Sequence, residues 1–181
     1  MAKKEVALIT GGGTGIGFAI AKKLHSMNKT VVLTGRRKEK LLQAKKILKT
    51  RCHILEHDIS RLETIPKLVI DIEKKIGPIN YLINNAGMHL RKIAVETTDE
   101  EWKNVIDTNL NSVFSLSREC AKKMIRRKKG NIILVGSVTT IMGLPDVTAY
   151  ATSKTALSGL ARTLAIELGK YSINVNCICP G

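Results

Sequence analysis

The chain has 181 residues, long enough for one domain with a substantial core, and 44% of them are hydrophobic, as in a globular protein. No apolar stretch approaches the roughly 18 residues of a membrane span, and no signal-peptide pattern opens the chain, so we expect a cytoplasmic protein without membrane contact. The net charge is +15, but aromatic residues make up only 3% and the charges are scattered along amphipathic segments, which argues against specific nucleic-acid binding.

Apolar runs of strand length alternate with periodic segments of helix length along the whole chain. This alternation predicts a parallel sheet with helices on both faces, and the near-continuous apolar strands indicate burial on both sides. The expected fold class is α/β: a single doubly wound domain of the Rossmann type over residues 1–181. Six strands are expected at 5–10, 30–35, 51–59, 80–87, 130–137 and 172–179. Five helices are expected: one near 15–27, a basic one that follows the second strand and runs through Lys49, and three near 61–76, 98–127 and 147–169.

The first strand runs into a glycine-rich segment, TGGGTGIG, which leads into the first helix. A bound pyrophosphate needs a tight turn, close approach of the backbone and a helix N-terminus, and this segment offers all three. The spacing differs from G-x-G-x-x-G and from a Walker loop, but in this context it predicts nucleotide binding. The candidate contacts are Thr10, Gly11, Gly13, Thr14, Gly15, Ile16 and Gly17.

Two further motifs stand at carboxyl ends of strands, where ligands bind in open α/β sheets. The third strand ends in HDI, whose Asp58 would reach a crevice in which an adenine amine could donate to it; a turn residue is the alternative. The fourth strand ends in NNAG, residues 84–87. Gly87 would let the chain approach a ligand closely, and the asparagine side chains could tie neighbouring strands together.

A polar residue interrupts the apolar stripe of the following helix. The stripe consists of Trp102, Ile106, Asn109, Val113, Leu116 and Cys120. A buried amide is costly unless it is paired. Asn109 is therefore either a structural hydrogen-bonding residue or a polar group placed at a site.

The fifth strand ends at Ser137, and Tyr150 and Lys154 lie one turn apart near the start of the next helix, on the same face. Lowering a phenol pKa from about 10 to about 7 takes roughly 4 kcal/mol, which an adjacent ammonium and a cationic nicotinamide ring could supply by favouring the phenolate. Ser137 could hold the substrate oxygen in the same network. The three residues together point to interconversion of an alcohol and a ketone.

The four cysteines, Cys52, Cys120, Cys177 and Cys179, contain no C-x-x-C pair, and the histidines show no ligand spacing. We therefore expect reduced thiols and no metal site. Cys177 and Cys179 alternate in an apolar run, which predicts that they face one side of a buried strand.

In these motifs the chain resembles the short-chain dehydrogenase/reductase family over its whole length. The resemblance rests on TGGGTGIG, NNAG, Asn109, Ser137, the Y-x-x-x-K of Tyr150 and Lys154, and the final Pro-Gly. It implies Tyr150 as general acid/base, Ser137 as anchor of the substrate oxygen, and Lys154 as the residue that holds the ribose hydroxyls and lowers the Tyr150 pKa. Asn109 would hold a water in a proton relay that reaches Lys154. The implied cofactor contacts beyond the glycine loop are Asp58, Ile59, Asn85, Ala86, Gly87, Tyr150, Lys154, Pro180 and Gly181.

The end of the second strand bears on the choice of cofactor. Members that prefer NAD usually carry an acid there, which accepts from the ribose 2′-hydroxyl. This chain has Gly35 followed by Arg36 and Arg37, and a guanidinium binds a 2′-phosphate. The sequence favours NADP(H), with Arg36 as the contact. NAD(H) stays open if both arginines only begin a basic helix.

The resemblance leaves two substrate classes open. The segment after NNAG is similar to sugar-acid dehydrogenases of the gluconate 5-dehydrogenase kind, with Arg91 or Lys92 as a carboxylate contact or merely a surface residue. 3-Oxoacyl-(acyl-carrier-protein) reductases share every motif above, and a basic surface suits their acidic carrier. A non-catalytic dinucleotide sensor on the same fold is the alternative function.

Family members usually continue well beyond the Pro-Gly pair, so a seventh strand and a substrate lid are expected to be missing here, and this chain itself is expected to show little or no turnover. The two long helices that carry Asn109 and Tyr150 are similar to those that form a four-helix interface in the family. A homodimer or homotetramer is expected for the complete protein.

Overall fold

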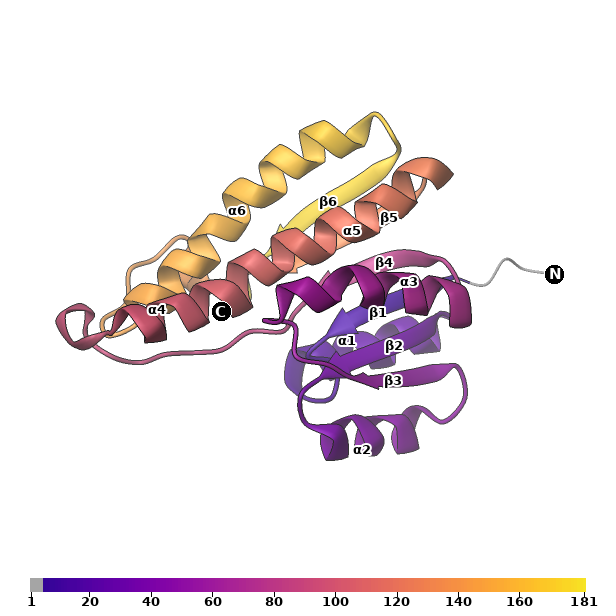
Figure 1. Cartoon of the computed structure of the whole chain (residues 1–181), viewed down its shortest axis with the longest axis horizontal. Coiled ribbons are helices and arrows are strands. Elements are labelled where there is room, and N and C mark those ends of the chain that lie inside the picture. Colours follow the sequence, from indigo (N-terminus) through magenta and orange to yellow (C-terminus); the bar gives the residue numbers. More distant parts are fainter. Residues whose placement is uncertain (1–4) are drawn as a thin grey trace.

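The computed structural model describes residues 5–181, which form a six-stranded, all-parallel sheet with helices on both faces (Figure 1). The strand order is β3-β2-β1-β4-β5-β6, so the predicted doubly wound fold is confirmed. The strands are β1 (Val6–Thr10), β2 (Thr30–Gly35), β3 (Cys52–Glu56), β4 (Ile79–Asn84), β5 (Gly130–Val135) and β6 (Ile173–Ile178). The α-helices are α1 (Gly15–Ser26), α2 (Lys38–Leu48), α3 (Ile65–Lys75), α4 (Asp99–Ile106), α5 (Ser112–Arg127) and α6 (Thr148–Gly169).

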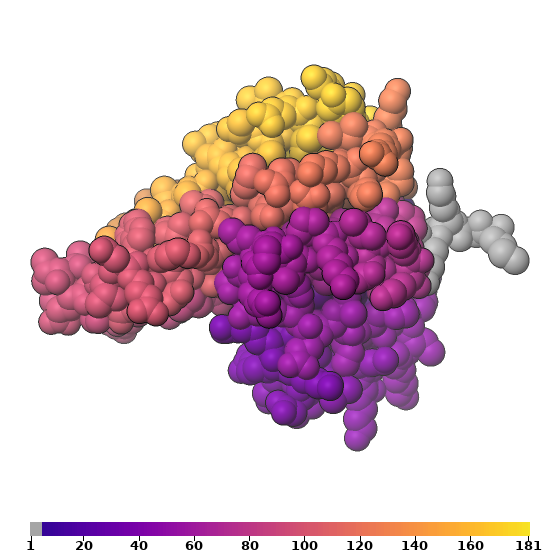
Figure 2. Space-filling view, viewed as in Figure 1, coloured from indigo at the N-terminus to yellow at the C-terminus, as the bar shows by residue number. Residues whose placement is uncertain are grey.

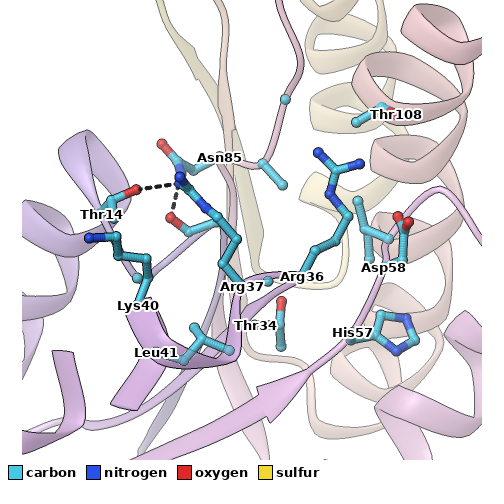
Figure 3. Close-up of a pocket in the computed structure, with 16 residues that line it drawn as sticks. Thr14, Thr34, Arg36, Arg37, Lys40, Leu41, His57, Asp58, Asn85 and Thr108 are labelled. Atoms are coloured by element: carbon cyan, nitrogen blue, oxygen red, sulfur yellow. Dashed lines mark hydrogen bonds between the residues drawn. The ribbon is translucent and has the colours of Figure 1, made fainter. Parts of the chain in front are cut away.

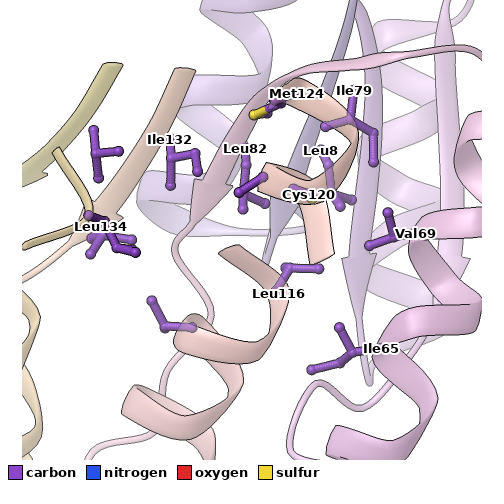
Figure 4. Packing of buried hydrophobic residues seen from close by; sticks show 14 of the residues in the cluster. Leu8, Ile65, Val69, Ile79, Leu82, Leu116, Cys120, Met124, Ile132 and Leu134 are labelled. Carbon is purple, nitrogen blue, oxygen red and sulfur yellow. The ribbon is translucent and has the colours of Figure 1, made fainter. Parts of the chain in front are cut away.

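The sheet separates two hydrophobic clusters because successive strand residues point to opposite faces. In β1, Val6 and Leu8 enter the cluster that packs against α3, α5 and α6, whereas Ala7 and Ile9 enter the one that packs against α1 and α2. Figure 4 shows the first cluster, with side chains of α3 and α5 lying over those of the central strands. Each fully buried Leu or Ile contributes roughly 1.5–3 kcal/mol, so these two layers hold the central strands in place.

The strand order places a topological switch point between β1 and β4. β1 pairs with β2 on one side and with β4 on the other. The connections that leave β1 and β4 therefore run to opposite faces of the sheet and open a crevice at the carboxyl ends of these strands. The glycine loop after β1 and the NNAG segment at the end of β4 meet there.

Strands β3 and β4 each end three residues before the end that the apolar runs predict. β3 ends at Glu56 rather than at residue 59, because Asp58 accepts from the backbone N–H and hydroxyl of Ser60 and forms a turn. β4 ends at Asn84, because the N–H of Asn85 donates to the Thr10 hydroxyl rather than into the sheet ladder. In both cases a side chain near the site takes the backbone out of the strand.

The predicted continuous helix over 98–127 is wrong in its middle. α4 and α5 are joined by a π-helical turn, Asp107–Asn111, which contains Asn109. The first residue of the predicted apolar stripe is also wrong. Trp102 is 39% exposed, and Val105, which was not assigned to the stripe, is fully buried. Wide turns of this kind are frequent at functional sites, and this one carries the polar residue of the stripe into the interior.

Strand β6 departs from the predicted burial on both faces. It lies at the edge of the sheet, where Ile173 and Val175 are buried against α6 while Asn174 and Asn176 are exposed. Cys177 is half-buried, and Cys179 lies beyond the end of the strand and is exposed, so the predicted burial of this pair is wrong for Cys179.

Replacing Glu5 with Gln should destabilise the fold at neutral pH. Hydrogen bonds from Lys129 and Lys29 hold the pKa of the Glu5 carboxyl at about 2, and the Tyr81 hydroxyl donates to it as well. A lowered carboxyl pKa adds stability above the unfolded-state value of about 4.5, and that stability is lost as the pH falls towards 2. Because the ion pairs of Glu5 with Lys29 and Lys129 are partly solvated, we expect the free energy of unfolding to drop by about 1–2 kcal/mol.

Urea denaturation at pH 7 and pH 3 tests this expectation. The free energies of unfolding of the parent and of Glu5→Gln should differ clearly at pH 7 and much less at pH 3. Glu167→Gln, on the exposed face of α6, is the control and should match the parent at both values. If the two proteins differ in free energy of unfolding by the same amount at pH 7 and at pH 3, the charge of Glu5 does not stabilise the fold.

Candidate active site

Two adjoining clefts open at the carboxyl ends of the strands. One, of about 280 Å³, lies between the glycine loop and the ends of β2, β3 and β4 (Figure 3). The other, of about 270 Å³, lies between the ends of β4 and β5 and the start of α6. Asn85 and Gly87 line both clefts, so the two form one elongated groove. α4 and the segment before it form a lobe that projects from the body of the molecule (Figure 2).

The glycine loop is shaped by glycines whose backbone conformation or surroundings disfavour a side chain. Gly11 and Gly15 have φ values of +63° and +53°, which favour glycine. A Cβ atom on Gly17 would stand 2.4 Å from Asn85 Nδ2 and 2.5 Å from the Gly11 carbonyl oxygen. The first helical turn therefore packs directly against the NNAG segment.

The N-terminus of α1 keeps its backbone donors available. Its N-cap residue, Thr14, makes no side-chain capping hydrogen bond, and the first turn holds no acidic residue. Unpaired N–H groups at the positive end of a helix attract anions. The predicted phosphate contacts thus lie around an uncapped helix start.

The glycine loop and the NNAG segment are joined by a compact hydrogen-bond network. The Thr10 hydroxyl accepts from the N–H groups of Asn85 and Ala86 at 3.0 and 2.9 Å. Asn85 Nδ2 donates to the carbonyl oxygens of Thr10 and Gly11 at 3.0 and 3.3 Å. Asn84 is buried and donates to the Ser117 hydroxyl at 3.0 Å. The structure therefore confirms that these amides tie elements together.

The outer end of the first cleft is cationic. Arg36, Arg37 and Lys40 line it, and Figure 3 shows the two guanidinium groups on opposite sides. Arg37 donates to the Thr14 hydroxyl at 3.4 Å. Burial opposes the charge of Asp58, but the Ser60 hydrogen bonds, with nearby Arg36, outweigh it and lower the pKa of the carboxyl. An anionic carboxylate and three cationic side chains thus share this end.

At the other end of the groove, Lys154 lies beside Tyr150 on α6. Lys154 is only 5% exposed, and its Nζ donates to the Val135 carbonyl oxygen at 2.7 Å. That nitrogen is 5.8 Å from the centre of the Tyr150 ring. Burial lowers the pKa of the Lys154 ammonium. Lys154 thus lies beside Tyr150, as expected from the sequence, and its effect on the phenol stays a prediction.

Ser137 lines the same cleft and is held by backbone pairing on both sides. The N–H groups of Gly136 and Val138 donate to the carbonyl oxygens of Ile178 and Pro180 at 2.7 and 2.9 Å. The Ser137 hydroxyl accepts from the Thr139 N–H at 3.2 Å. Its position relative to Tyr150 and Lys154 therefore depends on the end of β6.

Asn109 is fully buried, and its amide is paired on both sides. Its Oδ1 accepts from the Met88 N–H at 2.8 Å, and its Nδ2 donates to the Met88 carbonyl oxygen at 2.9 Å and to the Ser153 hydroxyl at 3.0 Å. A Cβ atom on Gly87 would stand 3.2 Å from Asn109 Oδ1 and 3.5 Å from Lys154 Nζ. Asn109 thus fixes the chain after β4 next to Lys154, and its part in a water relay stays a prediction.

Most predicted site residues line the groove, and some lie behind it. Thr10, Gly15, Gly17, Asn109 and Gly181 do not line either cleft, although the first three shape the glycine loop. Arg91 and Lys92 also lie outside both clefts, where they pair with Asp146 and Glu101. Sequence reasoning missed several lining residues, among them Lys40, Leu41, Thr108 and His89. Their only signal was proximity in sequence to the motifs.

The structure offers no sign of a metal or disulfide over residues 5–181. No group of three or more His, Cys, Asp or Glu side chains gathers there, and the four cysteines are free. Burial raises the pKa of the Cys177 thiol to about 11. Within the same range, every helix is too short or too polar to cross a membrane.

Comparison with known proteins gives a consistent result. The profile of the family described as short chain dehydrogenase matches residues 5–181. Nodulation protein G of Rhizobium sp. (strain N33) is 37% identical over 97% of this chain and 71% of its own length. The 3-oxoacyl-(acyl-carrier-protein) reductase FabG of Buchnera aphidicola is 35% identical over 98% of this chain and 73% of its own length. A gluconate 5-dehydrogenase from Burkholderia cenocepacia, solved with NADP and tartrate, superimposes with a TM-score of 0.92 at 28% identity and covers 99% of this chain and 71% of that one.

Proposed function

The chain belongs to the short-chain dehydrogenase family of NAD(P)-dependent oxidoreductases, and from this premise we propose that it transfers a hydride between NADP(H) and a secondary alcohol or ketone. The observation that carries the proposal is the groove itself. Its cationic nucleotide end joins, at Asn85 and Gly87, a cleft that contains Ser137, Tyr150 and the buried Lys154.

The residues present fit a dinucleotide. The uncapped start of α1 and the two loop glycines that line the first cleft, Gly11 and Gly13, suit a pyrophosphate. Arg36, Arg37 and Lys40 suit a further phosphate. Asp58 is available as an acceptor for an adenine amine. When bound, the cofactor supplies or accepts the hydride.

The chain's own residues would manage the substrate oxygen and its proton. Tyr150 gives its phenolic proton to the oxygen when a ketone is reduced and takes it back when an alcohol is oxidised. The Lys154 ammonium stabilises the phenolate that remains, an effect strengthened by the low dielectric of its buried position. Ser137 donates to the same substrate oxygen and orients it towards Tyr150.

The choice of NADP(H) rests on the cationic end of the first cleft. Arg36→Asp should shift the preference from NADPH towards NADH, because the new carboxylate repels a 2′-phosphate and can accept from a 2′-hydroxyl. Loss of the charged hydrogen bond between Arg36 and the 2′-phosphate should lower the affinity for NADPH by roughly ten- to hundredfold. Calorimetric titration of both coenzymes measures the ratio.

Lys22→Asp makes the same kind of charge change on the exposed middle of α1 and is the control. It should leave the NADPH/NADH ratio unchanged. If Arg36→Asp also leaves that ratio unchanged, Arg36 is only a surface residue and the NADP(H) assignment falls.

Two substrate classes remain in the proposal, sugar acids and 3-oxoacyl thioesters. The reductase and the gluconate dehydrogenase named above each support one of them. The net charge of +15 also suits an acidic carrier protein as partner. A screen that follows NADPH absorbance with ketoacids, sugar acids and 3-oxoacyl thioesters decides between them. Because this chain alone is expected to show little or no turnover, the screen and the kinetic tests below use as parent a version that carries the C-terminal part usual in the family. Turnover of neither class by that parent would count against the proposed function.

We include a homo-oligomeric assembly and a cytoplasmic location in the proposal. α5 and α6 leave Phe114 and Ile166 exposed, which suits packing against a second copy. The small residues Ala156, Gly159 and Ala165 on α6 allow close approach of helices.

A further inference from the structure

His89 is a polar side chain of the second cleft that has no role in the proposed mechanism. It lies two residues after the NNAG segment and lines the second cleft with Ser137, Tyr150 and Lys154. The centre of its ring is 4.6 Å from that of Tyr150, and the two ring planes are inclined at 48°. The imidazole therefore packs against the phenol ring in a tilted arrangement, while the residue as a whole is exposed at the cleft.

The backbone on both sides of His89 is anchored. On one side, both backbone polar groups of Met88 are bound by the Asn109 amide. On the other, the Lys92 N–H donates to the Asp146 carbonyl oxygen at 2.7 Å, and the Lys92 ammonium pairs with Glu101. Only three residues span the two anchors, so the position of His89 is determined by the buried Asn109 and by the start of α6.

The other polar side chains of this cleft are already engaged or assigned. Asn85 is bonded to the glycine loop, and the Lys154 ammonium donates to Val135. Ser137 and Tyr150 serve the reacting oxygen in the proposed mechanism. The remaining lining side chains, Ile16, Met88, Val135 and Pro180, are apolar. Among residues 5–181, no hydrogen-bond partner of the His89 imidazole is found, which leaves its ring nitrogens available to a ligand.

We propose that His89 is a substrate-binding residue that hydrogen-bonds a second oxygen of the substrate, near the carbonyl carbon that is reduced at Tyr150. The assignment rests on the proposed function and deepens it. The substrate is then a carbonyl compound with another carbonyl, hydroxyl or carboxylate group close to the reacting carbon. A ketone without a second oxygen would leave His89 unsatisfied and gain nothing from it.

The test compares three carbonyl probes in the parent, His89→Phe and His89→Gln. Phenylalanine keeps the ring contact with Tyr150 but removes both nitrogens, whereas glutamine keeps a hydrogen-bonding group. The probes are 5-ketogluconate, the N-acetylcysteamine thioester of acetoacetate, and cyclohexanone, which has no second oxygen. NADPH oxidation gives kcat and KM for each.

His89→Phe should raise KM for whichever dioxygenated probe the parent reduces by roughly tenfold or more, as expected for a lost hydrogen bond to an anionic or strongly polar oxygen. The kcat for that probe and the constants for cyclohexanone should stay near parent values, and His89→Gln should recover part of the loss. Lys74→Gln, on the exposed face of α3 and outside both clefts, should behave like the parent.

Equal KM values for parent and His89→Phe with the dioxygenated probe would overturn the assignment. An equal loss with cyclohexanone would overturn it too, because it would indicate a structural effect on Tyr150. A parent that reduces none of the probes counts against the proposed function. In that case, calorimetric binding of 5-ketogluconate to the NADP-loaded protein decides the role of His89, and equal affinity in parent and His89→Phe sinks it.

Discussion

Replacing Tyr150 with phenylalanine is expected to lower kcat by roughly two to four orders of magnitude while the affinity for NADPH stays near that of the parent. The substitution removes only the hydroxyl that donates the proton. The ring, its contact with His89 and the buried Lys154 beside it are all retained. Steady-state kinetics and coenzyme titration of the same preparations measure the two effects separately.

Tyr171 provides a matched control for this substitution. It lies in the turn between α6 and β6, and a lysine ammonium, that of Lys170, stands 5.3 Å from its ring centre. Tyr171→Phe therefore removes a hydroxyl from a similar tyrosine–lysine pair outside the groove, and kcat should not change. A Tyr150→Phe protein with the parent kcat would exclude Tyr150 as the acid. A parent that binds NADPH but reduces no carbonyl compound would favour the alternative of a dinucleotide sensor.

The second large effect is expected for Gly17→Ala. The added methyl group would lie within 2.5 Å of a backbone oxygen, that of Gly11, and of the Asn85 amide, so the glycine loop or the NNAG segment has to move. Overpacking of this kind costs about 1–3 kcal/mol, and the shifted backbone also leaves the geometry suited to a pyrophosphate. We expect a lower melting temperature and a loss of NADPH affinity of roughly tenfold or more.

Gly169→Ala is the control for Gly17→Ala. Gly169 is also a helical glycine, at the end of α6, but nothing lies within 4 Å of the position that its Cβ would take. This substitution should leave affinity unchanged and stability unchanged or slightly raised. If Gly17→Ala binds NADPH as tightly as Gly169→Ala, the glycine loop does not hold the cofactor.

The sequence was sufficient to predict the order of strands and helices, because apolar runs and helical periodicity report burial directly. It was also sufficient to place Tyr150 and Lys154 side by side, since the two residues are one helical turn apart. Strand ends were overestimated for a physical reason. The side chains of Thr10 and Asp58 accept hydrogen bonds from the backbone N–H groups of Asn85 and Ser60. These bonds turn the chain away from the sheet, and an apolar sequence pattern does not reveal them.

The π-helical turn and the role of the Asn109 amide were beyond sequence reasoning. Asn109 was placed correctly on a buried stripe, but its partner, the backbone of Met88, is 21 residues away and belongs to a loop. His89 was missed for the same reason. Its contact with Tyr150 depends on how that loop is anchored, and neither its residue type nor its spacing signals the contact.

Deuterium transfer from NADPH labelled at the transferred position tests the central claim most directly. The carbonyl probe that the protein reduces is incubated with labelled coenzyme, and the alcohol product is analysed by mass spectrometry. The account predicts one deuterium on the carbinol carbon with the parent and roughly a hundredfold or more less labelled product in the same time with Tyr150→Phe. An alcohol without deuterium, or a parent that binds NADPH tightly and yields no labelled alcohol from any ketoacid, sugar-acid or 3-oxoacyl probe, would contradict it.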